Sequence, residues 1–192
     1  MLRTFFLACV FLCAPLQTFA EDTTTLPNPQ VLIKTSEGDI TLRLYRDKAP
    51  ITVENFLSYV DAGFYNGTIF HRVIPDFMIQ GGGFLPDMTE KPTNEPIENE
   101  SKNRLHNTRG TIAMARTSDP DSATSQFYIN QRNNLPLDWS PGKEGYTVFG
   151  EVILGMSVVD YIATAPTDRL GAFGDVPVEP IVIEEIVRVN SL

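Results

Sequence analysis

Residues 70–84 read FHRVIPDFMIQGGGF, and this run is the most informative part of the chain. Its beginning, together with Ile69, is a short stretch of β-branched and aromatic residues as far as Ile74, which favours a strand. The glycines at 81–83 lack the Lys-Ser/Thr of a phosphate loop and the spacing of a dinucleotide fingerprint. We therefore expect these glycines to supply backbone freedom at a crowded turn.

Upstream of this run, the sequence predicts a β-hairpin and then a helix. Residues 31–35 and 40–45 are apolar, alternating segments on either side of a glycine-containing turn. A helix is expected to begin at Pro50 and to end at Gly63, because its apolar residues follow the i, i+3, i+4, i+7 spacing of one face. These apolar residues are Val53, Phe56, Leu57 and Val60.

Downstream, the pattern predicts more short strands and one further helix, at 156–163. The strands are expected at 111–115, 126–130, 146–152 and 181–189. Many short strands with two helices far apart favour a β-barrel or sandwich, since a parallel α/β sheet alternates the two elements. The proline-broken connection at 85–107 is either a binding loop or a tolerated surface insertion.

The N-terminus has the pattern of an export signal. Arg3 precedes an apolar run at 5–12, and Thr18-Phe-Ala20 has the spacing of a cleavage site. We expect a signal peptide at 1–20 that is cleaved after Ala20, a flexible leader at 21–29 and one domain at 30–192. The protein is then periplasmic or secreted and has no membrane segment. A membrane anchor is the alternative, but the apolar run is shorter than the ~20 residues of a spanning helix.

Charge and composition exclude several function classes. The net charge is −9, and removal of residues 1–20, which carry Arg3 and no acid, makes it −10, so nucleic acid is not an expected partner. Both cysteines, Cys9 and Cys13, lie in the signal, and a lipid-attached cysteine fits poorly there. The mature chain then offers His71 and His106 but no thiol, which argues against a zinc site or a thiol nucleophile. Calcium on loop carboxylates stays open.

Five blocks of sequence together resemble the cyclophilin signature. They are residues 70–84, Met114-Ala-Arg116, Ser125-Gln-Phe-Tyr-Ile-Asn130, 107–115 and 146–150. The resemblance runs from about Gln30 to the C-terminus and points to exported Gram-negative cyclophilins. It implies a mainly β protein, a closed eight-stranded antiparallel β-barrel capped by two α-helices, with a peptide groove outside the barrel. It also implies a peptidyl-prolyl cis/trans isomerase that needs no cofactor and no metal.

Arg72 matches the catalytic residue of this signature. Amide resonance places a barrier of ~18–20 kcal/mol against rotation about a peptide bond. A guanidinium that hydrogen-bonds the prolyl nitrogen of the twisted bond lowers that barrier, because the lone pair is free only in that state. A surface or ion-paired arginine is the alternative for Arg72.

The resemblance also assigns a substrate-binding set, although each apolar member taken singly is more often a core residue. Phe77, Met78, Phe127 and Leu137 match the proline pocket. Around it, the matching positions are Gln80, Gln126, Ala115, Arg116, Tyr128 and Tyr146. His71 is either a groove residue or a packed histidine, since neighbours on a strand face opposite sides.

One position departs from the family pattern. Pro136 stands where the family has an aromatic residue before Leu137 and Asp138, and the single tryptophan is Trp139. We therefore expect weak cyclosporin binding. A monomer is expected as well, because no apolar stripe is left over once the barrel and helices are filled.

The expected function is isomerisation of X-Pro bonds in proline-containing peptides and in unfolded exported proteins, which assists their folding. Uncatalysed isomerisation takes ~10–100 s, which is slow enough to limit folding. Two alternatives are a peptide-binding or chaperone module, which needs the pocket but not Arg72, and a structural surface protein that keeps the motif as scaffold.

Overall fold

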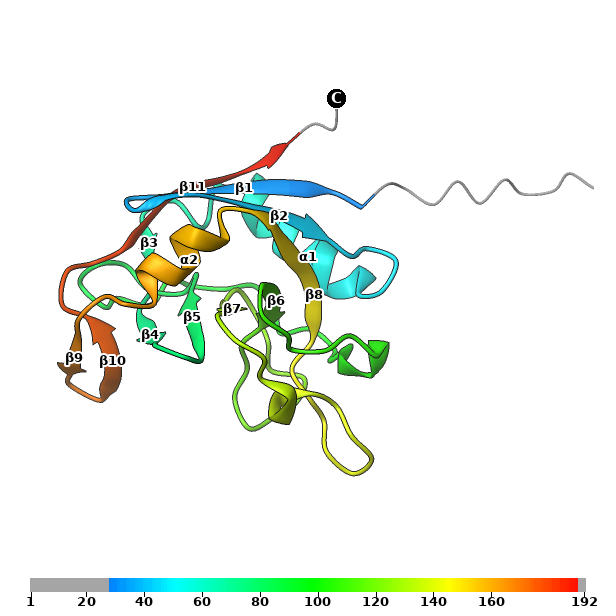
Figure 1. Cartoon of the computed structure of the whole chain (residues 1–192). Helices are drawn as coiled ribbons and strands as arrows, with labels where there is room; N and C mark the ends of the chain where they lie inside the picture. The colour runs from blue at the N-terminus through cyan, green and yellow to red at the C-terminus, as the bar shows by residue number, and fades with distance from the viewer. Residues whose placement is uncertain (1–27, 190–192) are drawn as a thin grey trace, which may run out of the picture.

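The fold begins with the hairpin that the sequence predicts. The computed structural model describes residues 28–189, in which β1 (Gln30–Thr35) pairs antiparallel with β2 (Gly38–Leu44) (Figure 1). Ile33 lies opposite Ile40, and the alternating apolar side chains of both strands have no exposed surface. The period of two thus turns one face of the hairpin into the core.

Helix α1 (Pro50–Asp61) packs its predicted apolar face into the same core. Pro50 occupies the first turn, where its missing N–H costs nothing, and the chain leaves the helix through Gly63 at φ +63°. Phe56 is fully buried, and its ring lies 5.3 Å from that of Phe149 and 5.7 Å from that of Phe127 between centroids. Complete burial of such a side chain contributes about 1.5–3 kcal/mol.

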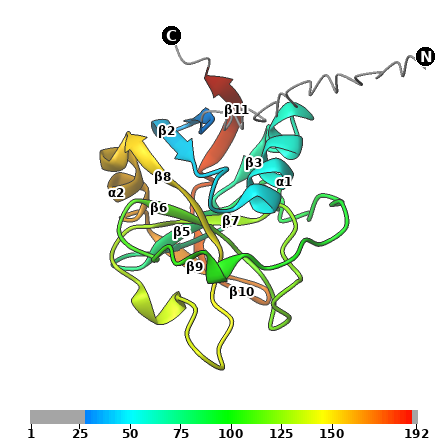
Figure 2. The same ribbon diagram turned by 90° about the vertical axis from the view of Figure 1, so that its right-hand side faces the viewer.

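Nine strands form one antiparallel sheet, in the order β3-β11-β1-β2-β8-β6-β7-β5-β4. The seven strands besides the hairpin are β3 (Thr68–Ile69), β4 (Arg72–Ile74), β5 (Met78–Gly81), β6 (Thr111–Met114), β7 (Phe127–Asn130), β8 (Val148–Leu154) and β11 (Val182–Val189). The sheet curls around its core, and α1 and α2 (Met156–Ile162) lie apart with strands between them (Figure 2).

The prediction of a mainly β protein with two helices is confirmed, but the sheet differs from a closed eight-stranded barrel. Its order ends at β3 on one side and at β4 on the other, and within residues 28–189 no strand ladder joins these two edges. The segment expected as one strand at 69–74 is therefore two strands. Phe70 and His71 carry the chain from one edge to the other, and Phe70 N–H donates to the carbonyl of Ile181 (3.0 Å).

A second, two-stranded sheet was not predicted. β9 (Thr167–Leu170) pairs with β10 (Phe173–Pro177) through a turn that contains Gly171 at φ +61°. This hairpin lies beside β4 (Figure 1). Every residue of β9 is exposed, so its sequence lacks the alternation of apolar and polar residues from which a strand is predicted.

The long connection at 85–107 is tied to the N-terminus of α1. The Glu100 carboxylate accepts hydrogen bonds from Thr52 N–H (2.8 Å), Thr52 Oγ1 (2.7 Å) and Ile51 N–H (3.2 Å). These N–H groups have no partner within the helix. A negative charge there also interacts favourably with the positive end of the helix dipole. Two short 3-10 helices, Ser101–Asn103 and Leu135–Leu137, complete the elements.

In the part of the chain that the structure describes, no helix is long and apolar enough to cross a membrane. The predicted signal peptide at 1–20 and most of the leader at 21–29 lie outside residues 28–189.

Candidate active site

Strand pairing places a row of side chains across the outer face of the sheet. Arg72 on β4 lies opposite Gln80 on β5, Gln80 lies opposite Tyr128 on β7, and Tyr128 lies opposite Ala113 on β6. Residues directly opposite in an antiparallel ladder share a face, so this register alone brings Arg72, Gln80 and Tyr128 together.

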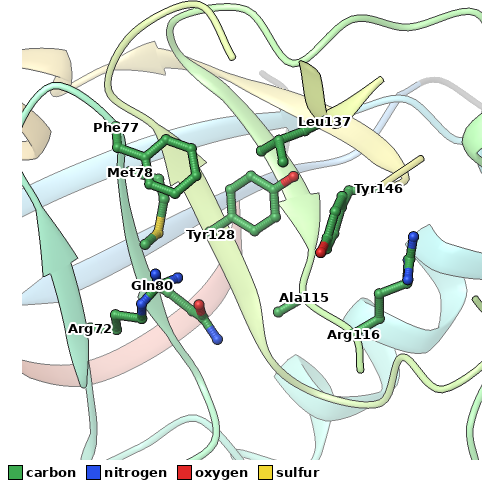
Figure 3. Close-up of a pocket in the computed structure, with 9 residues that line it drawn as sticks. All are labelled: Arg72, Phe77, Met78, Gln80, Ala115, Arg116, Tyr128, Leu137 and Tyr146. Atoms are coloured by element: carbon green, nitrogen blue, oxygen red, sulfur yellow. The ribbon is translucent and has the colours of Figure 1, made fainter. Parts of the chain in front are cut away.

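A pocket of about 140 Å³ opens along this row. It is lined by nine residues, all of which the sequence predicted: Arg72, Phe77, Met78, Gln80, Ala115, Arg116, Tyr128, Leu137 and Tyr146 (Figure 3). Arg72 and Gln80 lie side by side at one end, and the rings and thioether of the other residues surround the space next to them. The pocket thus joins a fixed cation to an apolar and aromatic cup.

Phe127 does not line this pocket, contrary to the prediction. Its ring has no exposed surface and packs inside the sheet, 5.6 Å from the ring of Tyr65 and 6.2 Å from that of Phe70. The reason is strand parity, because Phe127 and Tyr128 are neighbours on β7 and face opposite sides. Tyr128, predicted as a pocket wall, provides the aromatic surface there.

Gln126 and His71 also lie outside the pocket. Gln126 borders a second hollow that shares Gln80, Ala115 and Arg116 with the first, and its Oε1 accepts a 3.0 Å hydrogen bond from Gln80 Nε2. His71 is 5% exposed, and its ring packs against Phe84 with the centroids 4.6 Å apart. His71 is thus the packed histidine of the two alternatives.

The environment of His71 keeps its ring neutral. Burial, and secondarily the charge of Arg72, lowers its pKa to about 4. A neutral imidazole beside Arg72 adds no competing charge to the site.

The hydroxyl of Tyr128 has a dedicated partner inside the pocket wall. It donates to Asn107 Oδ1 (2.7 Å), and Asn107 is held in turn by Asp138, whose Oδ1 accepts from Asn107 N–H (2.7 Å) and Nδ2 (3.0 Å). Sequence reasoning missed Asn107, although a tyrosine in an apolar pocket signals that such a partner is needed.

Tyr146 is fixed by Arg116 and by a close approach of two loops. The Arg116 guanidinium lies 4.5 Å from the centroid of the Tyr146 ring and donates to the carbonyls of Glu144 (2.9 Å) and Gly145 (3.2 Å). A Cβ at Gly145 would lie 2.3 Å from the backbone nitrogen of Trp139, so only glycine fits there. Arg116 therefore both lines the pocket and packs against its aromatic wall.

Trp139 is 38% exposed and borders a different hollow, together with Arg104, Leu105 and His106. Leu137, two residues earlier, reaches the pocket of Arg72. The indole of Trp139 thus does not line the pocket of Arg72.

The arrangement suits a reaction that needs neither a nucleophile nor proton transfer. The nine lining residues offer two guanidinium groups, one amide, two tyrosine hydroxyls and an apolar cup, and none of the nine is a cysteine, a serine or an acid. These groups can hold an apolar ring and donate a hydrogen bond beside it.

Comparison with known proteins identifies the family. The family model described as cyclophilin type peptidyl-prolyl cis-trans isomerase/CLD matches residues 30–188. The chain belongs to the cyclophilin-type peptidyl-prolyl cis/trans isomerases. A peptidyl-prolyl cis-trans isomerase of Acinetobacter baylyi is 59% identical over 87% of this chain and 88% of its own length. Peptidyl-prolyl cis-trans isomerase A of Dickeya dadantii is 52% identical over 93% of this chain and 94% of its own.

A solved structure shares the cyclophilin fold. The cyclophilin-type isomerase of Cryptosporidium parvum, crystallised in the presence of the dipeptide Ala-Pro, superimposes with a TM-score of 0.73 at 30% identity. The match covers 84% of this chain and 99% of that one. The family, the isomerase activity and the mainly β fold predicted from the sequence are confirmed.

Proposed function

We propose that Arg72 is the catalytic residue of this cyclophilin and that the cup beside it binds the prolyl ring. The observation that carries the proposal is the row Arg72–Gln80–Tyr128, which sets the cation at the edge of an apolar pocket. As the X-Pro bond twists, the prolyl nitrogen recovers its lone pair, and Arg72 donates to it. This hydrogen bond is stronger in the twisted state than in either planar isomer, so it lowers the barrier.

The substrate class is the proline-containing peptide. The pocket, with a volume of about 140 Å³, has room for a five-membered ring, and it lies on the outer face of the sheet, where a peptide chain can cross it. The related structure obtained with Ala-Pro supports this class. Gln80, held by Gln126 at 3.0 Å, is proposed to keep the guanidinium in the plane of the groove.

The test is cis-to-trans relaxation of an X-Pro peptide with the wild type and Arg72→Ala. We expect Arg72→Ala to lose at least about 100-fold in kcat/KM, which corresponds to about 2.7 kcal/mol of transition-state stabilisation. Arg43→Ala is the matched control, because Arg43 is a half-exposed arginine that pairs with Glu151 (3.5 Å) on β2 and β8. Equal activity of both variants would refute the role of Arg72.

We propose further that the protein acts on exported proteins outside the cytosol. The support is the pattern of residues 1–20, with Arg3, an apolar run and Thr18-Phe-Ala20. Expression of the full chain in a Gram-negative host should yield a periplasmic protein whose N-terminus is Glu21. A protein that retains residues 1–20 in the cytosol would contradict this proposal.

Weak cyclosporin binding belongs to the same proposal. Trp139 borders the hollow with Arg104 and His106 instead of the pocket of Arg72. Titration of the drug against isomerase activity tests this, and a stoichiometric block at micromolar protein would contradict it.

A further inference from the structure

The hairpin β9–β10 brings a carboxylate to Arg72. Asp175 Oδ2 on β10 lies 3.7 Å from Arg72 Nε on β4, and the two side chains are 48% and 41% exposed. The two strands lie side by side (Figure 1), although they belong to different sheets. The contact is thus made from outside the sheet that carries the pocket.

The backbone of β10 is distorted where Asp175 projects. Asp175 adopts φ +60°, a left-handed conformation that is costly for a residue other than glycine. The same place is an irregularity of the ladder, because the register with β9 shifts between Phe173 and Val176. A bulge of this kind re-aims a side chain, and such distortions gather near active sites. Here the side chain that is re-aimed meets Arg72.

Aromatic packing fixes the hairpin to the segment that carries Arg72. The Phe173 ring lies edge-on to Phe84, with centroids 5.2 Å apart, and Phe84 packs on His71 at 4.6 Å. His71 precedes Arg72 in the chain. Phe173 therefore packs through Phe84 against His71, the residue before β4, while Asp175 contacts Arg72, the first residue of β4.

We propose that Asp175 is a positioning residue for Arg72. The guanidinium is a rigid plane, so a carboxylate at its Nε edge restricts its rotation and leaves both Nη groups for the substrate. This inference rests on the proposed function, since it assumes that Arg72 acts on the prolyl nitrogen. Asp175 then contributes to the active site from β10, although no residue of the hairpin lines the pocket.

The test compares Asp175→Asn with Asp168→Asn. Asparagine tolerates the left-handed conformation, so Asp175→Asn removes the charge without forcing the backbone to change. Asp168 is an exposed acid on β9, opposite Val176, and its replacement makes the same change in net charge. Because exposed ion pairs are weak, we expect Asp175→Asn to lower kcat about threefold with KM unchanged, and Asp168→Asn to change neither.

Two further readouts separate positioning from a merely structural role. In an Arg72→Lys background, Asp175→Asn should have no additional effect on kcat, because the Nε edge is absent. In the protein that keeps Arg72, the substitution Asp175→Asn should shift the NMR resonance of the Arg72 Nε–H, and Asp168→Asn should leave it unchanged.

These experiments distinguish a wrong role for Asp175 from a wrong role for Arg72. Full activity of Arg72→Lys and Arg72→Ala would refute the role of Arg72, and the positioning role would fall with it. Impaired Arg72 variants together with an unchanged kcat in Asp175→Asn would refute the positioning role alone. A loss confined to peptides with a basic residue would also overturn it, since Asp175 would then contact substrate directly.

Discussion

Tyr128 donates a 2.7 Å hydrogen bond to Oδ1 of Asn107 within the wall of the pocket beside Arg72. Burial raises the pKa of Tyr128 well above its ordinary value, so the hydroxyl stays protonated and remains a donor. Asn107 is buried and is fixed from the other side by Asp138. A tyrosine in an apolar wall is thus accommodated by a chain of polar groups behind the wall.

Removing the acceptor, Asn107, should lower the free energy of unfolding more than removing the donor, the hydroxyl of Tyr128. Asn107→Ala leaves the Tyr128 hydroxyl buried without its partner, which we expect to lower the free energy of unfolding by about 1–3 kcal/mol. Tyr128→Phe leaves Asn107 Oδ1 with the amide of Asn130 (3.2 Å), and it should cost about 0.5–1.5 kcal/mol. Urea unfolding of both variants and of the double variant measures the two costs and their coupling. Strictly additive costs would show that the bond contributes nothing.

A substitution in the core and one in the pocket lining should separate stability from activity. Phe127→Leu, on the core side, is expected to lower the free energy of unfolding by about 1–3 kcal/mol and to keep kcat/KM per folded molecule within about twofold. Leu137→Ala, in the half-buried pocket lining, should weaken kcat/KM more than it weakens folding. Thermal unfolding and the relaxation assay check both. A folded Phe127→Leu protein without activity would put Phe127 back among the pocket residues.

His71 should make stability fall in mild acid. Its pKa is about 4 in the folded protein and 6.5 as the ordinary value, so the unfolded chain binds the proton more readily between these limits. The contribution is complete above pH 6.5 and is lost as the pH falls towards 4. At 1.36 kcal/mol per pKa unit it amounts to about 3 kcal/mol. The difference in unfolding free energy between wild type and His71→Gln should shrink over this window, and a constant difference would contradict the shift.

The Glu100 carboxylate, which accepts hydrogen bonds at the start of α1, should stabilise the folded protein. Glu100→Gln keeps the length of the side chain but weakens its bonds to Thr52 and Ile51, and we expect a loss of about 1 kcal/mol in unfolding free energy. Glu98→Gln, an exposed neighbour, is the control with the same charge change. Equal values for the two variants would mean that Glu100 does not cap the helix.

Elements with strong periodicity could be predicted from the sequence. The hairpin of β1 and β2 and the helix α1 bury one regular face each, and the prediction of both is confirmed. The hairpin β9–β10 could not be found in this way, because β9 is exposed throughout and it is β10 that contacts β4. Asp175 escaped notice for the same reason.

The site was predictable as a set but not in every member. Nine of the predicted residues meet in one pocket, because the motif that carries them spans paired strands. Phe127 and Tyr128 were both predicted as pocket residues, since the sequence does not show which of two adjacent aromatics faces the core. The register between β5 and β7 decides that question in favour of Tyr128.

We propose that Arg72 lowers the rotational barrier of the X-Pro bond rather than holding the peptide. Exchange NMR on an Ala-Pro-containing peptide at saturating concentration measures the cis/trans rate on the enzyme separately from affinity. We expect Arg72→Ala to bind the peptide with an affinity within about tenfold of wild type, since the apolar cup is intact, and to slow the exchange at least about 100-fold. An unchanged exchange rate at saturation would show that Arg72 binds the peptide without lowering the rotational barrier.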